Sequence, residues 1–295
     1  MVKIKILKEE ESKIQVLLSK TDRSFANALR RSLISDTPKM AIDSVRFQLG
    51  TKEQDEEIWE TTGPIPDEMV AQRLAMIPIP TVHDKFHFQD ECPNCKDLVE
   101  VDRGCLECQM IYTCVVFGTE EGRWVTAGDM KYLGEEALEI PDEYKKIPIT
   151  KLMKGQMIEF YATAIMGRGR DHTKWSPVCG VTFHPRRIGV LKNKTKAKIL
   201  WDMNLEISAK DFNKDGKLDN VEKVAILADE LNHVGEGTEE SRAFKDAISL
   251  QEVPGEYILG FETDGSMSPK TAFMKAVEEL AERFGSLENE LSSSL

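Results

Sequence analysis

The chain has 295 residues, of which 41% are hydrophobic and 31% are charged. This composition excludes a disordered or membrane-embedded chain, and the length predicts two or three compact units. The net charge is −12, and residues 201–295 carry the whole excess, with 21 acidic and 9 basic side chains. The chain lacks the positive excess of proteins that bind nucleic acid by themselves, and its start lacks an apolar signal segment. We therefore expect a cytoplasmic protein that meets DNA only indirectly.

The first forty residues predict a hairpin followed by a helix. Apolar and polar residues alternate over 3–6 and again over 14–18, as they do in half-buried strands. The helix that follows has one apolar face, and it places Asn27, Arg30 and Arg31 together on another face. These three polar residues are candidates for binding a partner protein.

Short strands and turns are expected from about 41 to 165. Residues 66–74 predict one short helix, and 157–166 are apolar enough for a buried strand. Residues 111–117 and 123–126, joined by a glycine-containing turn, predict a hairpin.

The last third contains one helix signal at 221–231, a strand at 257–262 and a long final helix. Ser268 can cap that helix, and Pro269 suits its first turn. Its apolar residues form one stripe long enough to need a partner helix. The candidates for this contact are Phe273, Val277, Leu280 and Phe284.

Four of the six cysteines form two CxxC pairs, Cys92 with Cys95 and Cys105 with Cys108. Two such pairs separated by a short loop can place four thiolates around one ion, which is typical of a structural zinc site. A [4Fe–4S] cluster takes the same ligands, and reduced thiols without metal are the third alternative. A thiol–disulfide exchange site is disfavoured because neither pair lies at a strand-to-helix junction.

An acidic loop follows the calcium-binding pattern of an EF-hand. A solvated acidic turn before a helix explains the same residues equally well, and no second loop of this kind is present. The candidate calcium ligands are Asp211, Asn213, Asp215, Lys217 through its carbonyl, Asp219 and Glu222.

Several segments, in this order, resemble one family, the alpha-like subunits of multisubunit RNA polymerases. This family comprises the D-type chain of archaeal RNA polymerases, the third-largest subunit of eukaryotic polymerases and the N-terminal domain of bacterial alpha. The matching segments are 27–31 (NALRR), 38–45 (PKMAIDSV), 67–78 (DEMVAQRLAMIP), 154–156 (KGQ), 172–177 (HTKWSP) and 264–265 (DG).

The resemblance implies an α+β fold with a discontinuous alpha-like dimerisation domain, formed by 1–44 and 251–295 with about 173–184. A mostly-β domain, 45–172, would be inserted and would carry the zinc loop. Residues 185–250 would form a small acidic third segment. Some relatives hold an iron–sulfur cluster there, but this segment has no cysteine, so no such cluster is expected.

The resemblance also implies a scaffold function without catalytic residues of its own. The chain would form a heterodimer with subunit L, bind the small subunits N and P, and dock the two large catalytic subunits. The whole complex would be the DNA-directed nucleotidyltransferase. A stand-alone adaptor that binds zinc and calcium is the alternative from another class.

Overall fold

The computed structural model describes residues 2–54, 56–135, 138–203, 205–234 and 239–294. The chain divides into two compact units, each built from segments far apart in the sequence. One unit holds Met1–Leu7, Gln15–Asn27 and Thr182–Leu259, and the other holds Lys8–Ile14, Ala28–Val181 and Gly260–Leu295. The three-part division expected from the sequence stays a prediction.

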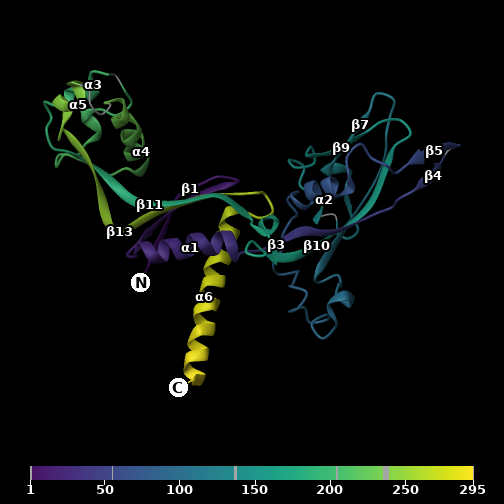
Figure 1. Cartoon of the computed structure of the whole chain (residues 1–295). Coiled ribbons are helices and arrows are strands. Elements are labelled where there is room, and N and C mark those ends of the chain that lie inside the picture. Colours follow the sequence, from purple (N-terminus) through teal and green to yellow (C-terminus); the bar gives the residue numbers. More distant parts are fainter. Residues whose placement is uncertain (1, 55, 136–137, 204, 235–238, 295) are drawn as a thin grey trace. The chain divides into compact units, whose positions relative to one another are not determined.

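A five-stranded sheet joins the two ends of the chain (Figure 1). Its strands, in spatial order, are β1 (Lys3–Glu9), β2 (Lys13–Ser19), β13 (Ile248–Thr263), β11 (Val178–Leu191) and β12 (Lys217–Leu218). The N-terminal hairpin therefore lies beside the last strand, where the Thr263 N–H donates to the Ser12 carbonyl at 2.8 Å. The hairpin predicted from the alternating pattern and the strand at 257–262 are both confirmed.

The two ends of the chain also contribute the helices α1 (Arg23–Ser35) and α6 (Pro269–Ser294). Asp22 begins α1 because its carboxylate accepts the Phe25 N–H at 2.8 Å. Ser268 begins α6 in the same way, accepting the Thr271 N–H at 3.2 Å, with Pro269 in the first turn. Both helices were expected from their apolar spacing, and α6 also from its cap at Ser268.

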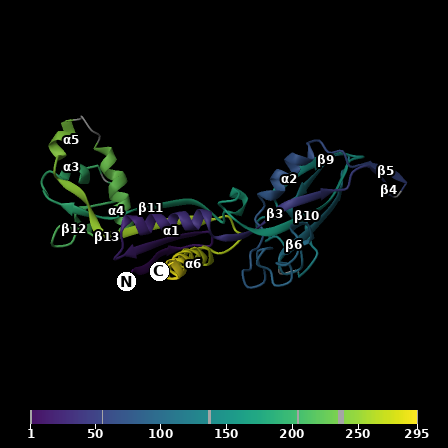
Figure 2. The same cartoon turned by 60° about the horizontal axis from the view of Figure 1, so that its bottom comes forward.

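The second unit is built around a four-stranded sheet (Figure 2). Its order is β3 (Pro38–Phe47), β10 (Met157–Arg168), β6 (Gln109–Phe117) and β8 (Lys131–Tyr132). Helix α2 (Asp67–Ala75) packs against β3 and β9 (Pro148–Leu152). The core includes the fully buried rings of Tyr112 and Phe160. The second cysteine pair lies directly before strand β6 of this sheet.

The hairpin predicted between 111–117 and 123–126 is wrong. Strand β6 is paired on one edge by β10 and on the other by β8. Strand β7 (Arg123–Thr126) instead pairs with β9 in a separate two-stranded sheet. A second small sheet joins β4 (Thr51–Gln54) and β5 (Glu57–Glu60).

Residues 191–250 have a small hydrophobic core of their own. It contains the fully buried Leu200 and Leu227 and includes Phe212. Three helices surround it, α3 (Lys198–Trp201), α4 (Val221–Glu230) and α5 (Glu239–Phe244). Helix α4 matches the signal seen at 221–231. No helix in the described part of the chain is both long and apolar enough to span a bilayer.

Single 3-10 turns occupy several connections between these elements. They are η1 (Glu100–Asp102), η2 (Ala127–Asp129), η4 (Thr173–Trp175), η5 (Ala209–Asp211) and η6 (Leu231–His233).

Candidate functional site

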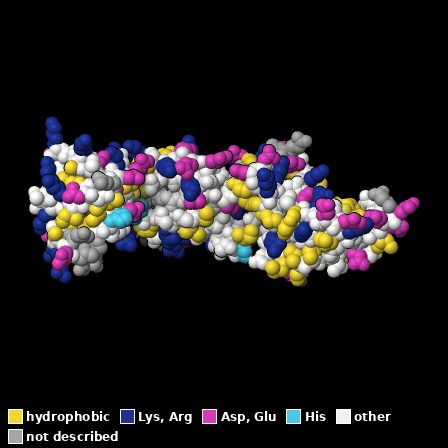
Figure 3. Space-filling view, turned by 90° about the horizontal axis from the view of Figure 1, so that it is seen from above, with side chains coloured by type: hydrophobic (Ala, Val, Ile, Leu, Met, Phe, Trp, Pro, Cys, Tyr) yellow, Lys and Arg dark blue, Asp and Glu magenta, His cyan; other side chains and the backbone are white. Residues whose placement is uncertain are grey.

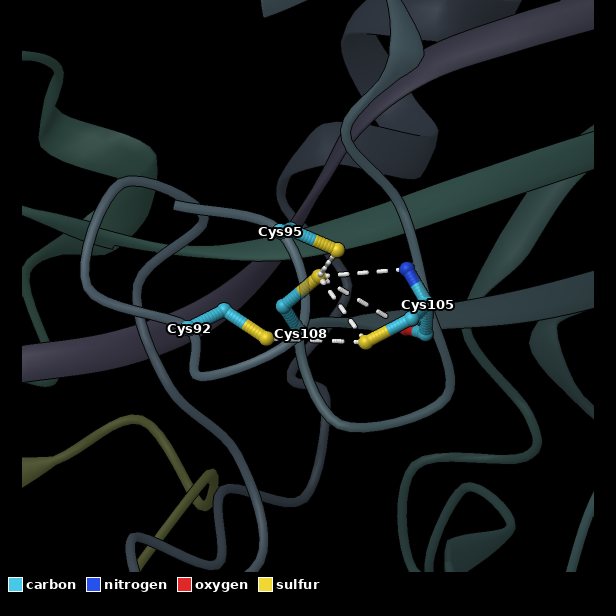
Figure 4. A group of neighbouring side chains, drawn as sticks. All are labelled: Cys92, Cys95, Cys105 and Cys108. Atoms are coloured by element: carbon cyan, nitrogen blue, oxygen red, sulfur yellow. Dashed lines mark hydrogen bonds between the residues drawn. The ribbon is translucent and has the colours of Figure 1, made fainter. Parts of the chain in front are cut away.

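The four cysteines of the CxxC pairs converge on one point (Figure 4). Their sulfur atoms all lie within 4.8 Å of one another. The Sγ–Sγ distances are 3.5 Å from Cys92 to Cys105, 3.7 Å from Cys105 to Cys108 and 3.8 Å from Cys95 to Cys108. Cys92, Cys95 and Cys108 are buried, and Cys105 is half-buried. The predicted set is thus brought together in full.

This geometry fits one tetrahedral ion. Zinc bound by four sulfurs at about 2.3 Å sets the sulfurs about 3.8 Å apart, close to the observed spacings. The backbone supports the site, since the N–H groups of Cys105 and Glu107 point at the sulfurs of Cys108 and Cys105, at 3.2 and 3.4 Å. Such donors stabilise thiolates and fix the two knuckles around the ion.

The thiols differ in acidity. Burial raises the pKa of Cys92 and of Cys108. Burial also opposes ionisation of Cys105, but hydrogen bonds from the Glu107 N–H and from the other three thiols outweigh it and lower its pKa to about 7. Cys105 therefore loses its proton more readily than Cys92 or Cys108, and a bound cation would displace the protons of its ligands.

Contacts outside the sulfurs lock the two loops together. The Asn94 amide donates to the Glu107 carboxylate at 2.9 Å, and the His87 N–H donates to the Glu107 carbonyl at the same distance. Gly104 has φ +146°, and a side chain there would meet the Gln109 amide at 2.6 Å. His83, which precedes the first cysteine pair in the sequence, has its Nε2 at 3.0 Å from the Pro38 carbonyl.

The acidic loop is organised differently from a calcium site. The carboxylate of Asp211 binds the Ser208 N–H and hydroxyl, both at 2.9 Å, and the Lys223 ammonium. Lys223 together with the Ser208 N–H lowers the pKa of Asp211 to about 2. The Asn213 side-chain oxygen accepts the N–H groups of Asp215 and Lys217, at 3.0 and 2.8 Å.

Two further candidate ligands of this loop are also engaged. The Lys217 carbonyl accepts the Asn213 N–H at 2.9 Å, and the Asp219 carboxylate pairs with Arg186. Glu222 is exposed in the first turn of α4. Within the described chain, the four cysteines are the only group of three or more His, Cys, Asp or Glu side chains close enough to share an ion. The predicted calcium site receives no support.

The candidate partner residues of α1 lie at different depths. Arg31 is exposed, whereas Asn27 and Arg30 are half-buried and make contacts within the chain. Only Arg31 is fully presented to solvent.

Helix α6 changes character along its length. Phe273 is only 6% exposed and packs inside the chain, and Val277 and Leu280 are half-buried. Phe284, in contrast, is 60% exposed. Leu287 and Leu291 continue the exposed stripe at 53% and 56%. The stripe expected from the sequence ran from Phe273 to Leu291 but omitted Leu287, although its spacing from Phe284 places it on the same face.

Ion pairs anchor the first half of α6. Lys39, itself buried, pairs with Asp264 just before the helix begins. Arg168 forms a two-pronged pair with Glu279 at 3.2 Å, and Arg283 binds the buried Asp36 at 2.6 Å. No hydrogen bond or ion pair among the described residues ties 284–294 to another element. The second half of α6 therefore keeps an exposed apolar stripe within the described chain.

Comparison with known proteins gives the family. A model of the RNA polymerase Rpb3/Rpb11 dimerisation domain matches residues 15–284, a range that includes α1, the cysteine centre and most of α6. The chain belongs to the Rpb3/Rpb11 dimerisation-domain family. The resemblance to the alpha-like polymerase subunits seen in the sequence is confirmed.

Relatives in this family match almost end to end. The DNA-directed RNA polymerase subunit Rpo3 of Picrophilus torridus is 30% identical, with 97% of this chain and 98% of the relative covered. Rpo3 of Pyrococcus horikoshii is 32% identical, with 99% and 98% covered. The RNA polymerase II subunit rpb3 of Dictyostelium discoideum is 27% identical, with 99% and 95% covered.

Proposed function

We propose that this chain is a non-catalytic assembly subunit of a DNA-directed RNA polymerase. The observation that carries the proposal is the family match across residues 15–284 together with an exposed apolar stripe on α6 that begins at Phe284, where the match ends. The stand-alone adaptor is not favoured, because the match covers nearly the whole chain and the calcium loop has its oxygens engaged.

The heterodimer contact would be made by the outer half of α6. Phe284, Leu287 and Leu291 form an apolar stripe that a partner helix can cover, as helices pair elsewhere along such stripes. Val277 and Leu280 would border this contact, whereas Phe273 would support it from inside the chain. The proposed partner is a smaller subunit of type L.

Further subunits would bind elsewhere. Arg31, with Asn27 and Arg30 beside it on α1, would touch the two large catalytic subunits, and the small subunits N and P would complete the platform. The chemistry of nucleotidyl transfer would belong to the large subunits, and this chain would hold them in place.

The cysteine centre would hold one structural Zn²⁺. The sulfur spacings and the N–H groups directed at them support this assignment, and all four ligands belong to the protein, which leaves no open position for substrate. The ion would therefore brace the loops without taking part in a reaction.

Co-expression with a candidate subunit L, followed by size-exclusion chromatography, tests the proposal. The triple variant Phe284→Asp, Leu287→Asp, Leu291→Asp should elute alone, because three carboxylates would be buried unpaired in the contact. The matched control is Ser286→Asp, Asn289→Asp, Ser293→Asp, which adds the same charge on the opposite face of the exposed half of α6 and should keep the heterodimer. A parent chain that stays monomeric with the partner, or equal loss in both variants, would refute the proposed contact.

A further inference from the structure

A concentrated positive charge lies immediately before the acidic last third of the chain. Residues 186–198 contain six basic side chains and no acidic one. Four are lysines at alternate positions after β11, and a fifth, Lys245, comes from the segment after α5. We call this set the lysine cluster: Lys192, Lys194, Lys196, Lys198 and Lys245.

The fold gathers these lysines. The Asn193 side-chain oxygen accepts the N–H groups of Thr195 and Lys196 at 3.0 and 3.1 Å, which turns the chain tightly into α3. The Lys196 ammonium donates to the Lys245 carbonyl at 3.2 Å, and the Lys192 N–H donates to the Ala247 carbonyl at 2.8 Å. The two segments are thus fastened to each other in two places.

The charge of the cluster is not neutralised within the described chain. All five lysines are exposed, and none forms an ion pair with a described residue. The nearby arginines behave differently, since Arg186 pairs with Glu256 and Arg187 lies 3.8 Å from Glu252. A chain with twelve surplus negative charges nevertheless places five lysines together without an ion pair to a described residue, and such a concentration of positive charge attracts a polyanion.

The surroundings of the cluster select the kind of polyanion. No large apolar side chain among the described residues 186–250 is exposed, so a protein partner would find no hydrophobic anchor. Within the same described range no Phe, Tyr or Trp ring is exposed, and such rings are the usual platforms on which the bases of a single strand stack. Lysine ammonium groups are point charges without the bidentate fork of arginine, so they neutralise phosphates without reading sequence.

We propose that the lysine cluster binds the phosphate backbone of duplex nucleic acid, independently of base sequence. Figure 3 shows Lys and Arg side chains, in dark blue, over the part of the chain that carries α3 and α5. Relatives of this chain are named as subunits of DNA-directed polymerases, so a duplex is the polyanion that such a complex handles. The indirect contact with DNA expected from the whole-chain charge would then be accompanied by a direct one.

The test measures binding of the full chain to a fluorescent duplex of about 30 base pairs by anisotropy, as salt rises from about 50 to about 200 mM. Five phosphate contacts predict that the affinity falls roughly 500-fold over this range. The variant Lys194→Gln, Lys196→Gln, Lys198→Gln should bind more weakly at low salt and lose only about tenfold over the same range. Thermal melting confirms that each variant is folded.

A matched control separates the cluster from general charge. Lys131→Gln, Lys146→Gln, Lys270→Gln removes the same charge from exposed lysines of three other segments and should retain the parental affinity and salt dependence. Equal loss in both triple variants, or no loss in the first, would overturn the proposal, as would failure of the parent to bind at the lowest salt. Tighter binding to the single strand of equal length, or to polyglutamate, would overturn the assignment to a duplex.

Discussion

Ser32 in α1 donates a hydrogen bond from its hydroxyl to the Ala276 carbonyl in α6 at 2.9 Å, and both residues are buried. The two positions are 244 residues apart, so this bond fastens the last helix to the first. Ser32→Ala leaves a buried carbonyl without that donor and should lower the free energy of unfolding by about 1–2 kcal/mol. Chemical denaturation measures this, with Ser286→Ala as a control that should change stability by less than about 0.5 kcal/mol. Equal effects of both changes would mean that the bond does not hold α6.

Removal of one thiol should empty the cysteine centre. Cys95→Ser is expected to abolish binding of about one Zn²⁺ per chain and to lower the melting temperature, because metal binding and folding of such loops are coupled. Elemental analysis and thermal melting of the purified chain give both readouts. Cys179→Ser, at an exposed cysteine outside the group, should keep the metal and the stability. An iron–sulfur cluster would instead give visible absorption, and elemental analysis would find iron in place of zinc.

Acid should weaken the acidic loop through Asp211. Its pKa is lowered to about 2 from 3.8, so the folded chain binds this proton less readily than the unfolded chain. The stabilisation is therefore present above about pH 4 and is lost as the pH falls toward 2. Asp211→Asn should cost on the order of 1 kcal/mol at pH 7, and the difference from the parent should shrink at pH 3.

The nearby Asp215 provides the control, because it is exposed and forms no ion pair with a described residue. Asp215→Asn should leave the pH dependence of unfolding unchanged. A cost for Asp211→Asn that is the same at both pH values would show that charge is not the cause.

Calcium should leave the chain unaffected. Asp211, Asn213 and Asp219 already use side-chain oxygens for contacts within the protein, so an ion would have to displace those contacts. The melting temperature in about 1 mM CaCl₂ should match that in the same concentration of MgCl₂. An ion whose Kd is a hundredfold lower than its concentration would instead add about 2.7 kcal/mol to the free energy of unfolding. A calcium-specific rise in the melting temperature would revive the EF-hand interpretation.

The sequence was sufficient to predict features that depend on interactions between residues close together in the chain. The apolar face of 23–35, the cap at Ser268 and the CxxC spacing predicted two helices and a four-sulfur centre. Pairing between distant strands was not readable in this way, because β7 finds its partner β9 across a long stretch of chain. The local alternation around Gly118 suggested the wrong neighbour.

The sequence also did not predict which apolar side chains are buried or where charge is locally concentrated. The sequence pattern of α6 is equally apolar around Phe273 and around Phe284. The chain nevertheless buries Phe273 and leaves Phe284 exposed. The lysine cluster was hidden because charge was counted over the first two hundred residues. A count over 186–198 would have found it.

The second cysteine pair ends at Cys108, and β6 begins at the next residue, Gln109. Strand β6 is flanked on both sides in its sheet, so there is no spacer between the ion's ligand and an inner strand of the unit. Scarcity of the metal would consequently be felt during maturation of the nascent chain, through misregistered strands, before any finished complex could lose it.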